Sequence, residues 1–311
     1  MSYEIVIEST CNLPLSLRER FGIYKEYIRG IVYMPDGDIE ADTEWSKISP
    51  KEYFKIVKKN AGKVRTAFAT YEEFIRVIEP ILKDGKDAIV FTISSAISGT
   101  YNAFLQYKEM LLEDYPGRSI EIIDTLKYDS AGGLLAIYAA QNKLEGMSFE
   151  NNVKWLNEKR HSIHEIGPMD DLRFLAKNGR LSAGKAFFGQ LAGVQPIADF
   201  SFDGKNVPLG TLKGDANVEK VVIEYLKATI VDPENQIIII SHSDRESRAL
   251  RFKELLEKEL KVKEVLLLSV GQSCGPNIGP GLCAYFYMGK PISENREEEN
   301  KLFLSLKESI K

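Results

Sequence analysis

The chain has 311 residues, 44% of them hydrophobic and 28% charged, with a formal net charge of −4. A chain of this length buries roughly three quarters of its unfolded surface and usually divides into two domains. The small, mixed charge contains no basic stripe, which argues against a nucleic-acid partner.

The cysteines and the N-terminal residues indicate in which cellular compartment the protein is expected. The three cysteines, Cys11, Cys274 and Cys283, lack the spacing of metal ligands. The first residues have neither the basic start nor the long apolar core of a signal peptide. Serines and glycine interrupt the uncharged residues 88–107, which fits a strand, loop and helix better than a membrane span. We therefore expect a cytoplasmic protein without a transmembrane segment, metal or cofactor.

The first part of the chain alternates strands and helices. Residues 4–8 predict a strand, and Asn12 precedes Pro14 in the manner of a helix N-cap. Residues 28–41 predict a hairpin around a Pro-Asp-Gly turn. Two capping boxes predict further helix starts, at Ser49-Pro50-Lys51-Glu52 and at Thr70-Tyr71-Glu72-Glu73.

The stretch from Asp87 to Met110 holds an apolar run, a hydroxyl-rich loop and an amphipathic segment. Residues 88–93 suit a strand buried on both faces of a parallel sheet, and a helix should start near Thr100. Open α/β sheets bind ligands in loops that leave the carboxyl end of such a strand. The free N–H groups of the helix and four hydroxyls in residues 94–100 predict an anionic ligand group, although hydroxyls there also serve as helix caps.

Residues 119–124 predict the next strand, and residues 129–142 the next helix. This repetition predicts a three-layer α/β domain with a mostly parallel sheet and helices on both faces. The pattern changes around residues 159–167, so we expect domains at 1–162 and 163–311.

The second domain is expected to be mixed α+β. It contains a helix near residues 169–177, a second short helix before Gly193, and an antiparallel strand pair at residues 194–200 and 207–212. Later segments predict a helix over 217–228, strands over 236–241 and 262–270, a helix capped by Ser243 to Glu246, and a charged C-terminal helix.

Two motifs resemble catalytic signatures but lack their context. Gly179 to Ala186 nearly matches a phosphate-binding P-loop, but Ala186 lacks the hydroxyl that holds magnesium and no buried strand precedes it. Gly271 to Gly275 spells a nucleophile elbow around Ser273. All three histidines precede that serine, whereas the hydrolase order places the histidine after it.

The remaining chemically active side chains have plain explanations. His161 and His164 have a His-x-x-His spacing, which is more typical here of surface or boundary histidines than of zinc ligands, because no further ligand accompanies them. We expect His242 to play a structural part beside a helix cap. Cys11 has no identifiable base, so it is expected to be a packed thiol.

Four segments, in the same order and spacing, resemble the DegV family of bacterial fatty-acid-binding proteins. This family includes the subunits that present a fatty acid to fatty acid kinase. The segments are Glu8 to Pro14, Ser94 to Tyr101, Asp171 to Leu175 with Gly179 to Ser182, and Gly279 to Gly281. The second is the most specific, and together they cover nearly the whole chain up to about Gly289.

The resemblance implies an α/β protein of two domains, with a fatty acid in an apolar tunnel between or beneath them. It places Thr66 at the position of a family threonine and Arg180 at a Gly-Arg pair near the tunnel mouth. We expect hydroxyls at the start of the central helix to hold the carboxylate. The predicted ligand-binding residues are Ser9, Thr66, Ser95, Ser98, Gly99, Arg180 and Asn277.

Several positions depart from the family pattern. Glu8 and Asn12 replace two aspartates, and Ala67 with Phe68 replace a Ser-Gln pair. Asn277 stands where members that serve the kinase usually have a histidine. An amide still donates a hydrogen bond to a lipid, but transfer chemistry or partner recognition depends more closely on that side chain.

The sequence thus predicts a non-enzymatic fatty-acid carrier, with any catalysis belonging to a partner such as a fatty acid kinase. The main alternative is an enzyme, either a serine or cysteine acyl hydrolase using Ser98 or Ser273 or a phosphotransferase component. A third hypothesis is a protein-interaction module that uses the charged C-terminal segment.

Overall fold

The computed structural model describes residues 2–180 and 193–310. The chain divides into two compact units, each of which packs mainly against itself. The first unit contains Met1–Ser49, Lys63–Arg160 and Gly271–Cys274, and the second contains Pro50–Gly62, His161–Val270 and Gly275–Lys311. The domain limits 1–162 and 163–311 remain a prediction. Each unit is described by itself below.

The first unit is built on a parallel sheet of β1 (Tyr3–Ile7), β5 (Asp87–Thr92) and β6 (Ile120–Asp124), in the order β1-β5-β6. Every residue of β5 is buried, as the uninterrupted apolar run predicts for a central parallel strand. The helices around this sheet are α1 (Leu15–Phe21), α3 (Tyr71–Lys83), α4 (Thr100–Leu112), α5 (Ser130–Leu144) and α6 (Phe149–Lys159).

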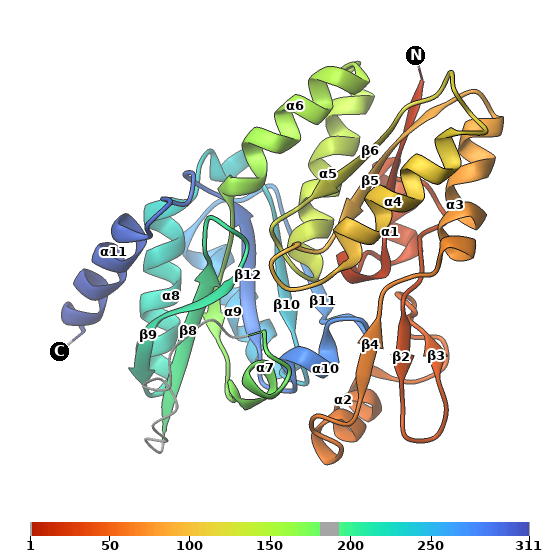
Figure 1. The fold of residues 1–311 in the computed structure, drawn as a ribbon. Coiled ribbons are helices and arrows are strands. Elements are labelled where there is room, and N and C mark those ends of the chain that lie inside the picture. The colour runs from red at the N-terminus through yellow and green to blue at the C-terminus, as the bar shows by residue number, and fades with distance from the viewer. Residues whose placement is uncertain (1, 181–192, 311) are drawn as a thin grey trace. The chain divides into compact units, whose positions relative to one another are not determined.

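Helices cover both faces of this sheet (Figure 1). Phe74 of α3 and Phe104 of α4 pack in one apolar cluster with Val90 of β5, and their rings meet edge to face at 5.2 Å. Helices α5 and α6 contact the strands as well, from the opposite side. The predicted three-layer α/β arrangement with a parallel sheet is confirmed.

A small antiparallel sheet of β3 (Ile39–Glu40), β2 (Ile31–Tyr33) and β4 (Arg65–Ala67) completes the first unit. It includes the predicted hairpin. Val32 lies opposite Thr66 in this sheet, and directly paired residues project to the same face. Val32 is fully buried and Thr66 is half-buried.

The second unit contains a six-stranded mixed sheet in the order β11-β10-β12-β7-β8-β9. Its strands are β7 (Ile163–Pro168), β8 (Val194–Phe200), β9 (Asn206–Lys213), β10 (Ile237–His242), β11 (Glu264–Ser269) and β12 (Cys283–Met288). Only the β10–β11 pair is parallel among these neighbours. The predicted mixed α+β architecture is therefore confirmed.

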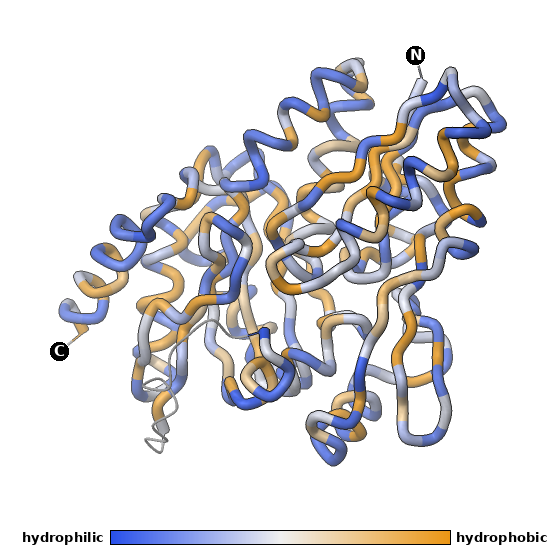
Figure 2. The backbone as a smooth tube through the Cα atoms, in the orientation of Figure 1, coloured by the Kyte–Doolittle hydropathy of each residue, from blue (hydrophilic) through white to orange (hydrophobic). Residues whose placement is uncertain are grey.

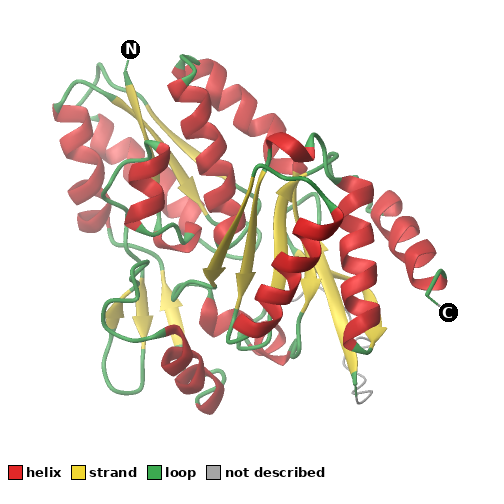
Figure 3. Ribbon diagram, turned by 180° about the vertical axis from the view of Figure 1, so that it is seen from behind, coloured by secondary structure: helices red, strands yellow, loops and turns green. Residues whose placement is uncertain are grey.

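Six helices accompany this sheet in the described part of the second unit. They are α2 (Pro50–Lys59), α7 (Arg173–Lys177), α8 (Asp215–Thr229), α9 (Glu246–Glu259), α10 (Gly275–Ile278) and α11 (Glu297–Glu308). Figure 3 shows α8 and α9 lying along the sheet, and their apolar residues share a core with the strands. Figure 2 shows hydrophobic residues concentrated along the strands of both units.

Short 3₁₀ turns join some of these elements: η1 (Ser9–Cys11), η2 (Arg160–Ser162) and η4 (Pro233–Asn235). In residues 2–180 and 193–310, no helix combines the length and apolar character needed to cross a membrane. The same residues contain no group of three or more His, Cys, Asp or Glu side chains placed to hold a metal ion.

Two predicted helix caps are wrong. Asn12 does not cap α1 but ends η1 in the left-handed region, at φ 50°, because its side chain bonds elsewhere. Pro14 occupies the N-cap position of α1 without a side-chain cap. Helix α9 starts after Arg245, and no side chain of the Ser243 segment caps it. The cap at Thr70 is confirmed, with the Glu73 N–H donating to its hydroxyl at 3.4 Å.

Helix α7 is shorter than predicted, beginning at Arg173 and not near Met169. The Met169 N–H donates to the Pro196 carbonyl of β8 and the Asp170 N–H to the Gly281 carbonyl, so the chain still pairs with neighbouring segments where the helix was expected to begin. The short helix predicted before Gly193 lies outside the described residues.

Candidate anion-binding site at the carboxyl edge of the parallel sheet

Three loops leave the same edge of the parallel sheet. Because β1, β5 and β6 run in one direction, their carboxyl ends meet at one edge. The first loop carries Ser9, the second carries the hydroxyl-rich residues 94–100, and the third carries residues 125–129. This is the edge at which open α/β sheets bind ligands.

The hydroxyl-rich loop is a tight turn held by its own polar groups. The Ser98 N–H donates to the Ser94 carbonyl at 3.1 Å, and the Ala96 N–H donates to the buried Ser94 hydroxyl at 3.2 Å. The Ser95 N–H donates to Asp124 Oδ1 at 3.0 Å, which ties the loop to the end of β6. Ser94 and Asp124 therefore fix the shape of the loop.

Ser98 and Thr100 form a pair at the start of α4. Their hydroxyl oxygens lie 2.8 Å apart, and the Thr100 N–H donates to Ser98 Oγ at 3.3 Å. Gly99 takes the N-cap position, where it offers no side chain. One hydrogen bond between two hydroxyls uses one of their two hydrogens. The pair thus supports the helix start and keeps one O–H group that can donate to a ligand.

Two further hydroxyls lack protein partners. Ser95 and Thr66 are half-buried, and in residues 2–180 and 193–310 neither side chain makes a hydrogen bond. The segment that carries Thr66 runs beside the start of α4: the Phe68 ring lies 3.4 Å from where a Cβ on Gly99 would be, and Tyr107 Oη donates to the Ala69 carbonyl at 3.4 Å. The structure thus brings the Thr66 segment next to the hydroxyl-rich loop.

Ser9 is fully engaged by the protein. Its buried Oγ accepts the Gly30 N–H at 3.0 Å and lies 2.8 Å from Ser273 Oγ. It also bonds to the Glu8 carboxylate and helps to lower the pKa of that group. A hydroxyl has one hydrogen and two lone pairs, so these three contacts use its whole capacity. Ser9 therefore positions its neighbours, and the predicted ligand contact at Ser9 would require displacing one of them.

Glu8 is the feature of this edge that the sequence analysis did not assign to the site. Its carboxylate accepts the Ile93 N–H at 3.1 Å and the Thr10 N–H at 3.1 Å, as well as the Thr10 hydroxyl. Burial raises the pKa of Glu8 above its usual value, and these hydrogen bonds oppose the rise only in part. The sequence feature that could have pointed to Glu8 is the position of a charged residue directly after the apolar strand β1.

The segment Gly271–Cys274 belongs to this edge as well. The Gly271 N–H donates to Asp129 Oδ1 at 2.8 Å, and a Cβ on Gly271 would lie 2.8 Å from the Asn12 side chain. The Asn12 amide in turn donates to Ser130 Oγ at 3.2 Å. The apparent nucleophile elbow is therefore a structural segment whose serine bonds to another hydroxyl.

The thiols near this edge are not poised as nucleophiles. Cys11 and Cys274 are buried, and burial raises the pKa of each thiol well above its usual value. Nearby carboxylates, Glu8 and Asp129, reinforce the rise. A buried neutral thiol is inert, in agreement with the packed thiol expected at Cys11.

The two remaining predicted ligand residues lie in the second unit. Arg180 is exposed, and its guanidinium donates to the Asn178 carbonyl. Asn277 is half-buried in α10, the short helix that contacts α7. Asn178 Nδ2 donates to the Pro276 carbonyl at 3.1 Å, which joins the two elements. Arg180 and Asn277 thus lie in neighbouring elements, and Leu181 and Ser182 of the same motif lie outside the described residues.

The expectation of surface or boundary histidines is wrong for His164. It lies in β7, fully buried, with Nδ1 3.0 Å from Asp199 Oδ2 and Nε2 2.8 Å from the Lys290 carbonyl. Burial would raise the pKa of Asp199, but the electrostatic interaction and the hydrogen bond with His164 hold it below its usual value. His161 stacks on Phe202 at 4.0 Å, so the two histidines have separate structural roles.

His242 has the structural part predicted for it. Its Nδ1 accepts the Arg245 N–H at 3.3 Å, just before α9 begins. This bond satisfies one N–H at the start of the helix.

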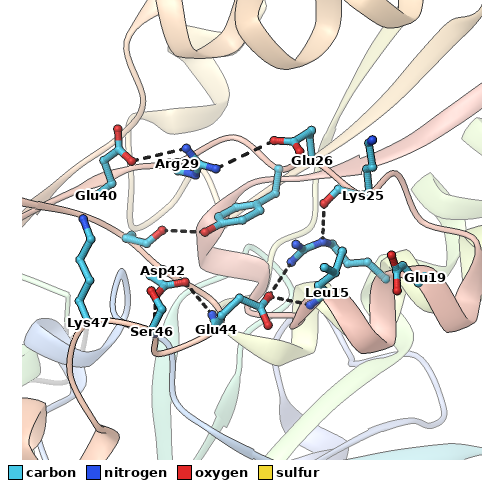
Figure 4. A pocket seen from close by; sticks show the side chains of 13 residues that line it. Leu15, Glu19, Lys25, Glu26, Arg29, Glu40, Asp42, Glu44, Ser46 and Lys47 are labelled. Atoms are coloured by element: carbon cyan, nitrogen blue, oxygen red, sulfur yellow. Dashed lines mark hydrogen bonds and ion pairs between the residues drawn. The ribbon is translucent and has the colours of Figure 1, made fainter.

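The first unit also contains a cavity of about 430 Å³ beside the β2–β3 hairpin (Figure 4). Its walls are charged. The buried Arg18 donates to the Lys25 carbonyl at 3.0 Å and lies 3.6 Å from Glu44, while Arg29 lies 3.5 Å from Glu40. Burial lowers the pKa of Arg18. An acyl chain needs apolar walls, so this cavity does not suit a lipid tail.

Comparisons with known protein families and proteins give matches over most of the chain. A family model described as "Uncharacterised protein, DegV family" matches residues 2–290. A DegV domain-containing protein of Clostridium perfringens is 29% identical over 287 residues, which cover 92% of this chain and 97% of the relative. A protein of Thermotoga maritima named fatty acid-binding protein is 27% identical over 292 residues, covering 92% of this chain and 97% of that protein.

Solved structures share the fold. DegV of Bacillus subtilis, described as a fatty acid binding protein, has a TM-score of 0.77 at 25% identity and covers 93% of this chain and 100% of its own. A DegV family protein of Thermus thermophilus has a TM-score of 0.81 at 24% identity, with coverage of 93% and 100%.

The protein is thus an α/β protein with hydroxyl donors gathered at the carboxyl edge of a parallel sheet. It belongs to the DegV family.

Proposed function

We propose that this protein binds a long-chain fatty acid. The carboxylate is held by hydroxyl and backbone donors at the start of α4, and the tail occupies an apolar tunnel. Relatives in the family are described as fatty-acid-binding, which supports this ligand class. The tail supplies most of the affinity, about 0.8 kcal/mol per buried methylene, while the head-group donors fix its orientation.

The proposal depends on several hydroxyl groups near the start of α4 whose hydrogens have no acceptor among the described residues. Ser95 and Thr66 have no hydrogen-bond partner in the described chain, and the pair of Ser98 and Thr100 keeps one free O–H group. Half-buried donors without acceptors favour an anion, because an unmet donor costs free energy. The N-terminus of the 13-residue helix α4 adds its positive dipole end.

Removing head-group donors should weaken retention of the fatty acid. We expect Thr66→Val with Ser98→Ala to lower the lipid content of purified protein, because each lost charge-assisted bond costs about 1.5–3 kcal/mol. Native mass spectrometry would show less of the adduct of fatty-acid mass. Ser2→Ala removes a hydroxyl that belongs to none of the predicted ligand contacts and serves as the control. Unchanged occupancy in the double variant would refute this head-group site.

The runner-up is an enzyme, either an acyl hydrolase or a phosphotransferase component. Ser98 bonds to Thr100 and Ser273 bonds to Ser9, and a hydroxyl is not a base that activates a serine at neutral pH. The carrier is therefore the better supported function. Turnover of acyl esters that disappears on Ser98→Ala or Ser273→Ala would establish the hydrolase.

We further propose that the bound acid is presented to a partner enzyme of the fatty acid kinase type. Asn277 and Arg180, in neighbouring elements of the second unit, are the side chains that would serve the transfer. The amide of Asn277 donates a hydrogen bond but does not carry a histidine's positive charge. Restoring a histidine with Asn277→His should raise the rate of kinase-dependent phosphorylation if the partnership exists.

A further inference from the structure

The second unit contains a cavity of about 460 Å³ where the ends of α2 and α7 meet the loop at Pro280. This volume is within the range of small-molecule sites. Its charged lining includes Lys58 of α2, Arg173 and Lys177 of α7, and the aspartates at 170, 171 and 244. None of these residues belongs to the hydroxyl site proposed above for the fatty acid.

Close packing fixes the walls of this cavity. A Cβ on Gly279 would come within 2.3 Å of the Phe174 ring, so the glycine loop lies directly on α7. A Cβ on Gly281 would come within 2.6 Å of Asp170 in the same way. The backbone on one side of the cavity is therefore closely packed, whereas the side chains of Lys58, Arg173 and Lys177 are exposed.

Two of the three carboxylates are already neutralised by arginines. Asp170 accepts hydrogen bonds from Nε and Nη2 of Arg245, the former at 2.8 Å, and lies 3.5 Å from Arg248. Asp171 accepts from Nε and Nη2 of Arg173 at 2.8 and 2.7 Å. These bonds use Nε and Nη2 of Arg173, and within residues 2–180 and 193–310 its Nη1 makes no hydrogen bond. These aspartates thus cancel little of the remaining positive charge.

The two lysines, in contrast, form no salt bridge in the part of the chain that the structure describes, although the charge of Lys177 helps to lower the pKa of Asp171. The stem of Lys177 lies against Gly62, with Cδ 3.9 Å from the position of a Cβ there, so the end of α7 meets the segment after α2. Asp244 is the one lining carboxylate that forms no ion pair in that part of the chain. The two lysines and Asp244 together therefore carry a net charge of about +1, since the other lining charges are paired.

A plain explanation of the lysines is incomplete. Both lie in the last turn of a helix, where a positive charge interacts favourably with the helix dipole. That effect requires no cavity. It also does not explain why Lys58, Lys177 and Arg173 line the same cavity in a chain of net charge −4.

We propose that this cavity binds the phosphate group of a phosphate ester. The ammonium groups of Lys58 and Lys177 and the free edge of Arg173 contact its oxygens, because phosphate accepts several charge-assisted hydrogen bonds at once. The ester is either a free small molecule or the head group of a phospholipid, since both present the same chemistry.

Titration of the intact protein with glycerol 3-phosphate tests the free source. We expect saturable binding that weakens as ionic strength rises, and a loss of about tenfold or more in affinity for Lys58→Gln with Lys177→Gln. Lys55→Gln is the matched control, because Lys55 is an exposed lysine of α2 that does not line the cavity. If Lys55→Gln weakened binding equally, the proposal would be overturned, because the ligand would then be attracted by general surface charge and not by this cavity.

Sedimentation with vesicles tests the head-group source. Binding to phosphatidylcholine vesicles that contain phosphatidic acid, lost in the double lysine variant, assigns the phosphate to a lipid. Failure to bind either glycerol 3-phosphate or these vesicles would overturn the proposal. Fatty-acid content measured in the same variants keeps the two ideas apart, because the lysine variants should retain their acyl ligand.

Discussion

At the scale of single residues, the carboxyl edge of the parallel sheet depends on the buried carboxylate of Glu8. It receives N–H groups from Thr10 and from Ile93, the residue that precedes the hydroxyl-rich loop. The carboxylate therefore joins the ends of two neighbouring strands. A charged group in this position costs desolvation free energy that its hydrogen bonds offset in part.

The substitution Glu8→Gln should therefore remove a pH-dependent contribution to the free energy of unfolding. The pKa of Glu8 is raised in the folded protein, so the folded state binds a proton more tightly than the unfolded state does. The contribution of Glu8 to stability should fall as pH rises above its ordinary value of 4.5. Urea unfolding of both proteins between pH 4 and 7 measures the difference. A difference in unfolding free energy that grows in favour of wild type with rising pH would contradict the assignment.

The environment of a residue was predictable only where it depends on nearby sequence. Ser95 and Ser98 could be placed in a loop after a buried strand because they follow an apolar run. The hydroxyl of Ser9 forms a hydrogen bond with Ser273, which lies 264 residues later, so no local sequence pattern predicts it. The burial of His164 likewise depends on Asp199 and the Lys290 carbonyl, supplied by distant segments.

At the scale of elements, backbone pairing decides where helices end and begin. The parallel strands and α4 were predictable because their apolar patterns are continuous and long. The start of α7 was not, since the N–H groups of Met169 and Asp170 pair with carbonyls on other segments. The start of α9 was also misjudged, because Asp244 adopts a positive φ of 54° and does not cap the helix.

Packing between β9 and α11 gives a prediction at this scale. A Cβ on Gly210 would lie 2.3 Å from Cε1 of Phe303, so Gly210→Ala should push that ring and its helix away from the strand. Overpacking of this kind costs about 1–3 kcal/mol. Hydrogen exchange of α11 amides should become faster. Gly117→Ala, whose Cβ would meet nothing within 4 Å, is the control.

At the scale of the whole molecule, a fatty acid should stabilise the folded chain by mass action. A ligand that binds only the folded state at 100 times its dissociation constant adds about 2.7 kcal/mol. Delipidated protein should therefore unfold at a lower temperature and recover on addition of the acid. Differential scanning calorimetry would check this, with a methyl ester of equal chain length testing whether the carboxylate matters. Equal melting temperatures with and without the acid would contradict the carrier function.

The hydrogen bond between Ser9 and Ser273 has a consequence for biosynthesis. It joins two positions of the first unit that are 264 residues apart, and the neighbouring bond from Gly271 to Asp129 depends on the same late segment. A ribosome synthesises this segment after all the other residues of the first unit. The carboxyl edge of the parallel sheet is therefore completed only after the residues of the second unit that precede this segment have been synthesised.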